Sequence, residues 1–375
     1  MSNSKFSSLF KLKIPIVGAP MAGVSGYALA TEVTKAGGLG FIAAGYMKES
    51  KLLVEEIEKA RRKLNLGNEE SQTPIGIGYI TFHLDMYPQL LLDILKYQPK
   101  AIWFSFGDCR KWFSHIRKHS PTTSIFVQVQ SVDEAIKMAN YGADVIVGQG
   151  NEAGGHGAKT NGSTLTLIPE IADRLDGKVP LLAAGGIIDG RAIVAALSLG
   201  ANGVVLGTSL LGSPESLLHP NFKEKIIATK DGGKSTIRTH IFDQLREIPW
   251  DFETYDGRVL TNVTTRQVAQ LRLNSTQVKD LKPSFQKAMA DGDPNTGVVI
   301  SLSTEESQLI SINPIVKLSG HFRGKWSRFS KFYKASWTDH SRVLSRSYQT
   351  HANSIKNYSK ALNSEILAHI YYPYY

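Results

Sequence analysis

The stretch PLLAAGGIIDGRAIVAALSLGANGVVLGT, residues 180–208, contains one complete strand–helix–strand unit. Its apolar runs Pro180–Ala184 and Gly203–Leu206 predict buried strands, and Arg191–Leu199 between them has a helical pattern. Two strands joined through a helix pair in parallel, because a parallel connection needs a crossover. This stretch therefore predicts an α/β fold.

The same alternation extends toward the N-terminus. Six more strands are predicted at Ile14–Gly18, Leu39–Ala44, Ile75–Ile80, Ala101–Ser105, Ser124–Val129 and Asp144–Val147. Helices are predicted between them at Ala28–Ala36, Lys51–Leu64, Tyr87–Tyr97, Cys109–Lys118, Val132–Asn140 and Thr166–Leu175. Eight evenly spaced strands within about 200 residues favour a TIM-type (β/α)8 barrel. An open doubly wound sheet uses the same units and is the alternative.

Three parts are expected along the chain. Residues 1–213 form the barrel, and residues 214–293, which are polar and helical, form a small, mostly helical domain after the eighth strand. Residues 294–375 form a divergent C-terminal tail, rich in Ser, Lys, Arg and aromatic residues.

Charge is concentrated in this tail. Of the net charge of +10, residues 317–375 contribute +8, from ten Lys or Arg against Asp339 and Glu365. A nucleic-acid site is expected as a basic stripe on a folded domain. The near-neutral main body therefore indicates an enzyme for small molecules and argues against nucleic acid as the partner.

Composition also bears on the compartment. The single cysteine, Cys109, excludes an internal disulfide and fits a reducing environment. No apolar run approaches the roughly 18 residues needed to cross a membrane. The N-terminus has no secretory signal. We expect a cytoplasmic protein without a membrane partner, with a mitochondrial location as the alternative.

Two glycine loops follow the last two predicted strands. Gly185 and Gly186 follow the seventh strand, and Gly207 and Thr208 follow the eighth. Glycine lets backbone N–H groups approach an anion, and the start of a helix adds its dipole. Tight turns alone would also explain one such loop. Two loops after adjacent strands predict a phosphate site.

A glycine-rich loop with a histidine follows the sixth strand. In VGQGNEAGGHG, residues 147–157, His156 offers an imidazole for proton transfer or for attracting an anion. Its place at the rim favours a functional role over that of a surface histidine. In IVGAPMAG, residues 16–23, Met21 suits the face of an aromatic ring, although such a turn is also ordinary turn chemistry.

Together these motifs resemble the nitronate monooxygenase family, formerly called 2-nitropropane dioxygenases. Residues 101–108 and 235–239 resemble its fungal members, and the resemblance covers about residues 14–293. It implies an FMN-dependent barrel enzyme that uses O2 to oxidise small anionic alkyl nitronates, such as propionate 3-nitronate, to a carbonyl compound and nitrite. No metal site is implied.

The resemblance also implies roles for individual residues. His156 corresponds to the active-site histidine, either holding the nitronate or removing the α-proton of a nitroalkane. The cofactor residues are Ala19, Pro20 and Met21 against the isoalloxazine ring, Gln128, Gln149 and Gly150 at its polar edge, and Gly185, Gly186, Gly207 and Thr208 at the phosphate.

Other functions remain open at this point. A flavin-barrel enoyl-acyl carrier protein reductase shares these loops but takes hydride from NAD(P)H. A relative of inosine monophosphate dehydrogenase needs a nucleophilic cysteine, for which Cys109 is poorly placed. A third reading is an inactive flavin-binding module that interacts through the tail, where basic and aromatic residues alternate over 323–334. An accessory tail without such a role is the plainer interpretation.

Overall fold

Eight parallel strands form the centre of the structure, a computed structural model that describes residues 4–67 and 72–297. They pair in the order β1-β9-β8-β6-β5-β4-β3-β2, and a parallel bridge between Val17 and Leu39 joins β1 to the segment before β2. The strands are β1 (Ile16–Gly18), β2 (Phe41–Ala43), β3 (Thr73–Ile80), β4 (Pro99–Ser105), β5 (Ser124–Val129), β6 (Val145–Gln149), β8 (Leu181–Ala184) and β9 (Gly203–Leu206). The predicted (β/α)8 barrel is confirmed.

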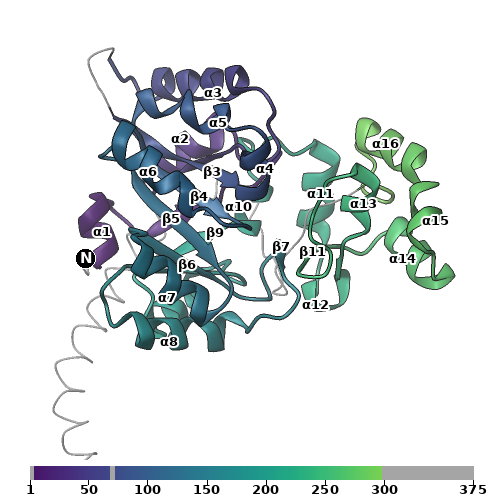
Figure 1. The fold of residues 1–375 in the computed structure, drawn as a ribbon. Helices are drawn as coiled ribbons and strands as arrows, with labels where there is room; N and C mark the ends of the chain where they lie inside the picture. The colour runs from purple at the N-terminus through teal and green to yellow at the C-terminus, as the bar shows by residue number, and fades with distance from the viewer. Residues whose placement is uncertain (1–3, 68–71, 298–375) are drawn as a thin grey trace, which may run out of the picture. The chain divides into compact units, whose positions relative to one another are not determined.

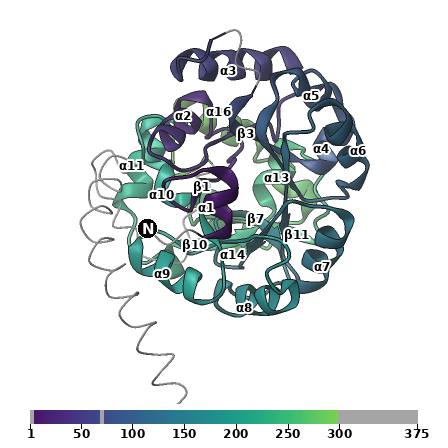
Figure 2. The ribbon, with the colours of Figure 1, turned by 90° about the vertical axis from the view of Figure 1, so that its left-hand side faces the viewer.

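Helices surround the strands (Figures 1 and 2). Those at predicted positions are α2 (Tyr27–Lys35), α3 (Ser50–Lys63), α6 (Arg110–His119), α7 (Val132–Tyr141), α8 (Thr164–Leu175) and α9 (Gly190–Ser198). Capping side chains fix where three of these helices begin. The side-chain oxygens of Ser131, Ser163 and Asp189 accept hydrogen bonds from backbone N–H groups in the first turns of α7, α8 and α9.

One predicted helix was wrong in detail. Instead of a single helix over Tyr87–Tyr97, the connection from β3 to β4 contains α4 (Thr81–Met86), α5 (Gln89–Leu92) and the 3-10 turn η1 (Leu95–Tyr97). Pro88 lies between α4 and α5, where it has no N–H to continue the earlier helix.

The barrel interior is apolar below its C-terminal rim. Trp103, Phe126, Val147 and Val205 belong to one buried cluster formed by inward-facing side chains of the strands. A helix not predicted from the sequence, α1 (Lys5–Phe10), adds Phe6 and Phe10 to this cluster and packs them edge-on against Phe126. Apolar layers thus fill the lower barrel and leave the rim for polar groups.

The segment after β9 is mostly helical but also contributes two strands. Its helices are α10 (Thr208–Leu211), α11 (Pro220–Ala228), α12 (Gly232–Ser235), α13 (Ile241–Arg246), α14 (Val263–Leu271), α15 (Ser275–Lys279) and α16 (Lys282–Asp291). Its strands β10 (Thr236–Thr239) and β11 (Tyr255–Leu260) form an antiparallel sheet with β7 (Gly155–Ala158), which comes from the loop after β6. This segment therefore lies over the rim of the barrel (Figure 1).

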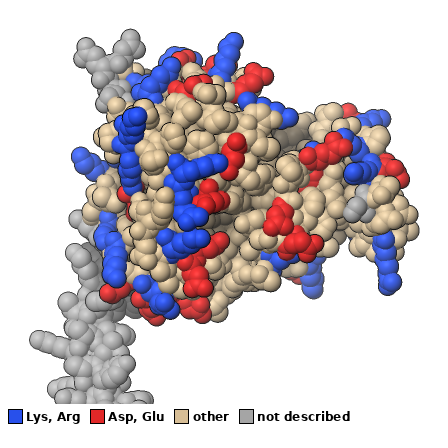
Figure 3. Space-filling model, in the orientation of Figure 1, with Lys and Arg blue, Asp and Glu red and all other residues tan. Residues whose placement is uncertain are grey.

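Other predictions are not decided by the fold. The domain limits 1–213, 214–293 and 294–375 stay predictions, and residues 298–375 lie outside the described part. Acidic and basic side chains are interspersed on the face shown in Figure 3. Within the described residues, no helix has the length and apolar character required to traverse a bilayer.

Candidate active site

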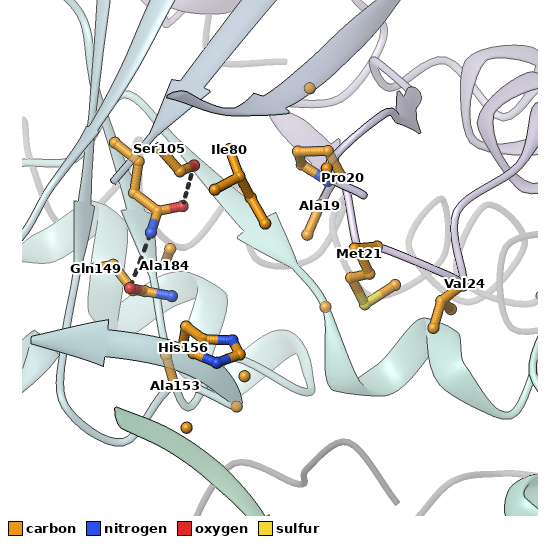
Figure 4. A pocket seen from close by; sticks show the side chains of 18 of the residues that line it. Ala19, Pro20, Met21, Val24, Ile80, Ser105, Gln149, Ala153, His156 and Ala184 are labelled. Carbon is orange, nitrogen blue, oxygen red and sulfur yellow. Dashed lines mark hydrogen bonds between the residues drawn. The ribbon is translucent and has the colours of Figure 1, made fainter. Parts of the chain in front are cut away.

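A cavity lies at the C-terminal ends of the barrel strands, covered by β7, α13 and β11. It is lined by ten of the eleven residues that the sequence analysis selected: Ala19, Pro20, Met21, Gln128, Gln149, His156, Gly185, Gly186, Gly207 and Thr208. In Figure 4, His156 and Gln149 lie on one side of the cavity and Ala19, Pro20 and Met21 on the other.

Gly150 is the exception, because it packs behind the cavity wall. Its N–H donates to the carbonyl of Ala184, and a Cβ at this position would lie 2.3 Å from the backbone nitrogen of Thr164. The carboxylate of Glu152 accepts hydrogen bonds from that same nitrogen at 2.9 Å. Gly150 and Glu152 thus shape the loop after β6 from behind.

His156 lies on β7, in register with Gly257 of β11, and not in an irregular loop. Its Nε2 is 2.8 Å from Oδ2 of Asp243, which is buried on α13. Nη2 of Arg246 donates to the other carboxylate oxygen at 2.9 Å. The carboxylate of Asp243 therefore holds the imidazole by Nε2–H. This leaves Nδ1 as an acceptor in the neutral ring or a second donor in the cation.

Aromatic side chains hold His156 on a second side. The indole of Trp250 stacks on the imidazole, with ring centroids 3.9 Å apart and planes 3° apart. Phe106 packs edge-on against Trp250 and Tyr255. Phe106 has φ +58°, a left-handed conformation that non-glycine residues rarely adopt. Stacking on Trp250 thus fixes the plane of the imidazole ring, and the contact with Asp243 fixes the rotation of the ring within that plane.

Tyr46 extends this contact network behind Trp250. The indole Nε1–H of Trp250 donates to the phenol oxygen at 3.1 Å, and the guanidinium of Arg246 lies 5.8 Å from the phenol ring centroid. Burial raises the pKa of Tyr46 to about 12, so the phenol stays protonated in the working pH range.

Two arginines fasten the small sheet to the loop after β6. Arg238 on β10 and Arg258 on β11 both donate to the carbonyl of Asn151, each at 3.2 Å. Arg238 also donates to the carbonyl of Gly157 at 3.1 Å. These bonds keep β7, and with it His156, against the segment that carries Asp243.

The loop after β8, at the other end of the cavity, depends on glycine. Gly185 and Gly186 have φ of +112° and +67°, and a Cβ on Gly185 would lie 2.9 Å from Oγ1 of Thr164. Nearby, Oγ of Ser209 is buried without a hydrogen-bond partner among the described residues. An anion with several acceptor oxygens suits such a place.

The start of α9 contributes less than expected. The side chain of Asp189 accepts hydrogen bonds from the N–H groups of Arg191 and Ala192 at 2.9 and 3.1 Å. This carboxylate occupies the positive end of the helix. An anion at this end of the cavity would therefore meet the backbone of the glycine loops and not a free helix start.

The opposite wall is apolar and closely packed. Pro20 packs closely against Gly78 of β3. A Cβ added to Gly78 would lie 2.2 Å from the Cβ of Pro20. The hydroxyl of Ser25 accepts from the N–H of Met21 at 3.2 Å and donates to the carbonyl of Ala19 at 2.9 Å. The turn after β1 is thus held as a firm apolar surface suited to a flat ring.

Cys109 is not part of this site. It is buried at the start of α6 and does not line the cavity, and burial raises the pKa of its thiol to about 12. A thiolate nucleophile of the kind that an inosine monophosphate dehydrogenase relative requires is therefore not available from this residue.

A family model described as nitronate monooxygenase matches residues 3–318. The nitronate monooxygenase npaC of Metarhizium robertsii is 35% identical over 266 residues, covering 67% of this chain and 73% of that protein. A nitronate monooxygenase of Neurospora crassa is 34% identical over 316 residues, covering 76% and 82%.

Solved structures share the fold. FabK from Thermotoga maritima superposes with a TM-score of 0.71 at 25% identity, covering 88% of this chain and 100% of that one. A nitroalkane oxidase from Streptomyces ansochromogenes superposes with a TM-score of 0.65 at 25% identity, covering 80% and 92%.

Proposed function

Because the chain belongs to the nitronate monooxygenase family, we propose that it is an FMN-dependent oxidoreductase that uses O2 to convert alkyl nitronates of the propionate 3-nitronate type into a carbonyl compound and nitrite. The observation that carries this proposal is the composition of one cavity. It combines an apolar turn, a wall of amide groups, two glycine loops and a histidine held by a carboxylate.

The cavity fits FMN at both ends. Ala19, Pro20 and Met21 offer an apolar surface for the isoalloxazine ring, and Gln149 offers a polar group at the ring's edge. Gly185, Gly186, Gly207 and Thr208 would hold the phosphate. Next to Thr208 in the chain, the buried hydroxyl of Ser209 has no hydrogen-bond partner among the described residues. Bound FMN would supply the redox chemistry.

His156 acts on the substrate in one of two ways. When the imidazole is neutral, Asp243 fixes the proton on Nε2, and Nδ1 can accept the α-proton of a nitroalkane. When the imidazole is protonated, Asp243 stabilises the positive charge, and Nδ1–H can hold a nitronate oxygen. Replacing His156 with Asn separates these roles. Normal turnover of preformed nitronate would exclude an essential part in nitronate oxidation.

The proposed function is tested on the purified protein by an absorbance spectrum, O2 uptake and nitrite release with propionate 3-nitronate. We expect flavin absorbance and O2-dependent nitrite formation. Rapid anaerobic bleaching of the flavin by NAD(P)H, without turnover of nitronate, would favour the reductase. A yellow protein that consumes no O2 with any nitronate would favour the inactive module.

A further inference from the structure

Four polar side chains form a connected group on the inner wall of the barrel, directly above the apolar layers. Inward-facing positions alternate along each strand, so Ser105 follows Trp103 on β4, Gln128 follows Phe126 on β5, and Gln149 follows Val147 on β6. The pairing of β4 with β5 ends at Phe104 and Val127, one residue before Ser105 and Gln128, whereas Gln128 is in register with Val147, two residues before Gln149. Gln130, just after β5, completes the group.

Their hydrogen bonds form two chains that end on one atom. In the first, Nε1 of Trp103 donates to Oγ of Ser105 at 2.8 Å, Ser105 donates to Oε1 of Gln128 at 3.2 Å, and Nε2 of Gln128 donates to Oε1 of Gln149 at 2.9 Å. In the second, the backbone N–H of Ala158 donates to Oε1 of Gln130 at 2.9 Å, and Nε2 of Gln130 donates to Oε1 of Gln149 at 2.6 Å.

The direction of the second chain is fixed, because it begins at a backbone N–H group, which can only donate. The N–H of Ala158 requires the oxygen of Gln130 to face it, so the amide nitrogen of Gln130 must face Gln149. Because Gln130 fixes the oxygen of Gln149, the NH2 group of Gln128 donates to that oxygen. The oxygen of Gln128 then faces Ser105, whose hydroxyl donates to it while accepting from the indole of Trp103. The oxygen of Gln149 therefore receives two N–H donors. Turning the amide of Gln149 over would place its N–H groups against those of Gln130, whose orientation the N–H of Ala158 fixes.

The NH2 group of Gln149 is consequently directed away from its two partners and toward the cavity, as Figure 4 shows. Gln149 is thus a hydrogen-bond donor of fixed orientation. A freely turning amide would present its oxygen to the cavity part of the time. That oxygen would repel the carbonyl oxygens at the polar edge of an isoalloxazine ring.

We propose that Trp103, Ser105 and Gln130 are positioning residues that hold the Gln149 amide with its NH2 toward an acceptor atom of the FMN ring. This inference rests on the proposed function. Ser105 also lines the cavity, but its hydroxyl is engaged by Trp103 and Gln128. If it acts through Gln128 and Gln149, as we propose, its replacement matters for FMN only while the Gln149 amide is present.

The test is a double-mutant cycle on the dissociation constant of FMN, measured by quenching of flavin fluorescence on addition of the apoprotein. Gln149→Met removes the amide at nearly constant length and is expected to weaken binding about tenfold, the range for one hydrogen bond. Ser105→Ala is expected to weaken it about threefold. The double variant should bind no more than twofold more weakly than Gln149→Met alone.

A control variant, Ser105→Thr, keeps the hydroxyl and should bind FMN within twofold of the wild type. Independent effects, which multiply to about thirtyfold in the double variant, would overturn the inference, as would an unchanged dissociation constant in Ser105→Ala. Thermal unfolding of each apoprotein identifies a general loss of structure, which would persist in the Gln149→Met background. Failure of the wild-type protein to bind FMN would instead overturn the proposed function itself.

Discussion

The imidazole of His156 and the carboxylate of Asp243 lie 2.8 Å apart, although 87 residues separate them in the chain. Pairing of β7 with β11 brings His156 under the segment that carries α13. Arg246 holds the second carboxylate oxygen, so Asp243 cannot turn away from the imidazole. The orientation of His156 thus depends on a buried group contributed from beyond the barrel.

Asp243→Asn should therefore lower turnover of nitronate strongly. The variant keeps the shape of the side chain but removes the charge that stabilises a protonated imidazole. Charge-assisted hydrogen bonds contribute about 1.5–3 kcal/mol, which corresponds to a 10- to 100-fold fall in kcat/KM. Asp173→Asn, the same change at an exposed position of α8, is the matched control and should have no effect. Equal activities of both variants would exclude a role for the carboxylate.

The phosphate end of the cavity can be tested with two glycines near each other in sequence. Gly185→Ala forces a side chain into φ +112° and within 2.9 Å of Oγ1 of Thr164. We expect FMN affinity to fall at least about tenfold, since left-handed strain costs roughly 1–2 kcal/mol before any displacement of the loop. Gly190→Ala, where the added Cβ meets open space, should bind FMN normally. Comparable affinities for both variants would place the phosphate elsewhere.

Stability at high pH should reveal the buried phenol behind Trp250. Burial raises the pKa of Tyr46 from 10 to about 12, so the unfolded chain loses this proton at lower pH than the folded chain does. Below pH 10 Tyr46 is protonated in both the folded and the unfolded state, so it leaves the free energy of unfolding unchanged. As the pH rises from 10 toward 12 the unfolded chain loses the proton first, and the free energy of unfolding falls. Between pH 9 and 11 the wild type should lose about 1.4 kcal/mol more than Tyr46→Phe. Urea unfolding of the wild type and of Tyr46→Phe at pH 9 and pH 11 measures this difference. Equal losses of stability in the two proteins would contradict the raised pKa of Tyr46.

Cys109 should be inert in the native protein. Its burial and its pKa of about 12 keep it as a thiol at pH 8. A chromogenic disulfide reagent should react with the denatured chain quickly and with the native protein at least about a hundredfold more slowly. Rapid labelling of the native protein, with loss of activity, would bring back the alternative that uses a cysteine nucleophile.

The barrel could be predicted from the sequence because its strands are covered on both faces and appear as short apolar runs. Ser124–Val129 and Gly203–Leu206 have the same bounds in the structure as in the prediction. The glycines and His156 could also be selected, because they follow strands whose ends meet at one rim. Each of these patterns lies within a few consecutive residues, so it can be recognised without knowledge of the fold.

The partners of His156 could not be found this way. Asp243 and Trp250 lie in a segment without a diagnostic period, and only the pairing of β7 with β11 brings them to the imidazole. The strand character of Gly155–Ala158 was hidden for the same reason, since a glycine-rich run becomes a strand only when its partner is present. Gly150 could not be distinguished from the cavity-lining glycines, because glycine allows close packing behind a wall as readily as in front of it.

The most direct test of the central claim is a crystal structure of the protein with FMN bound. We expect the phosphate at the loops of Gly185, Gly186 and Gly207, and the imidazole of His156 facing the isoalloxazine ring. A phosphate bound away from these loops, or a ring out of reach of His156, would contradict it.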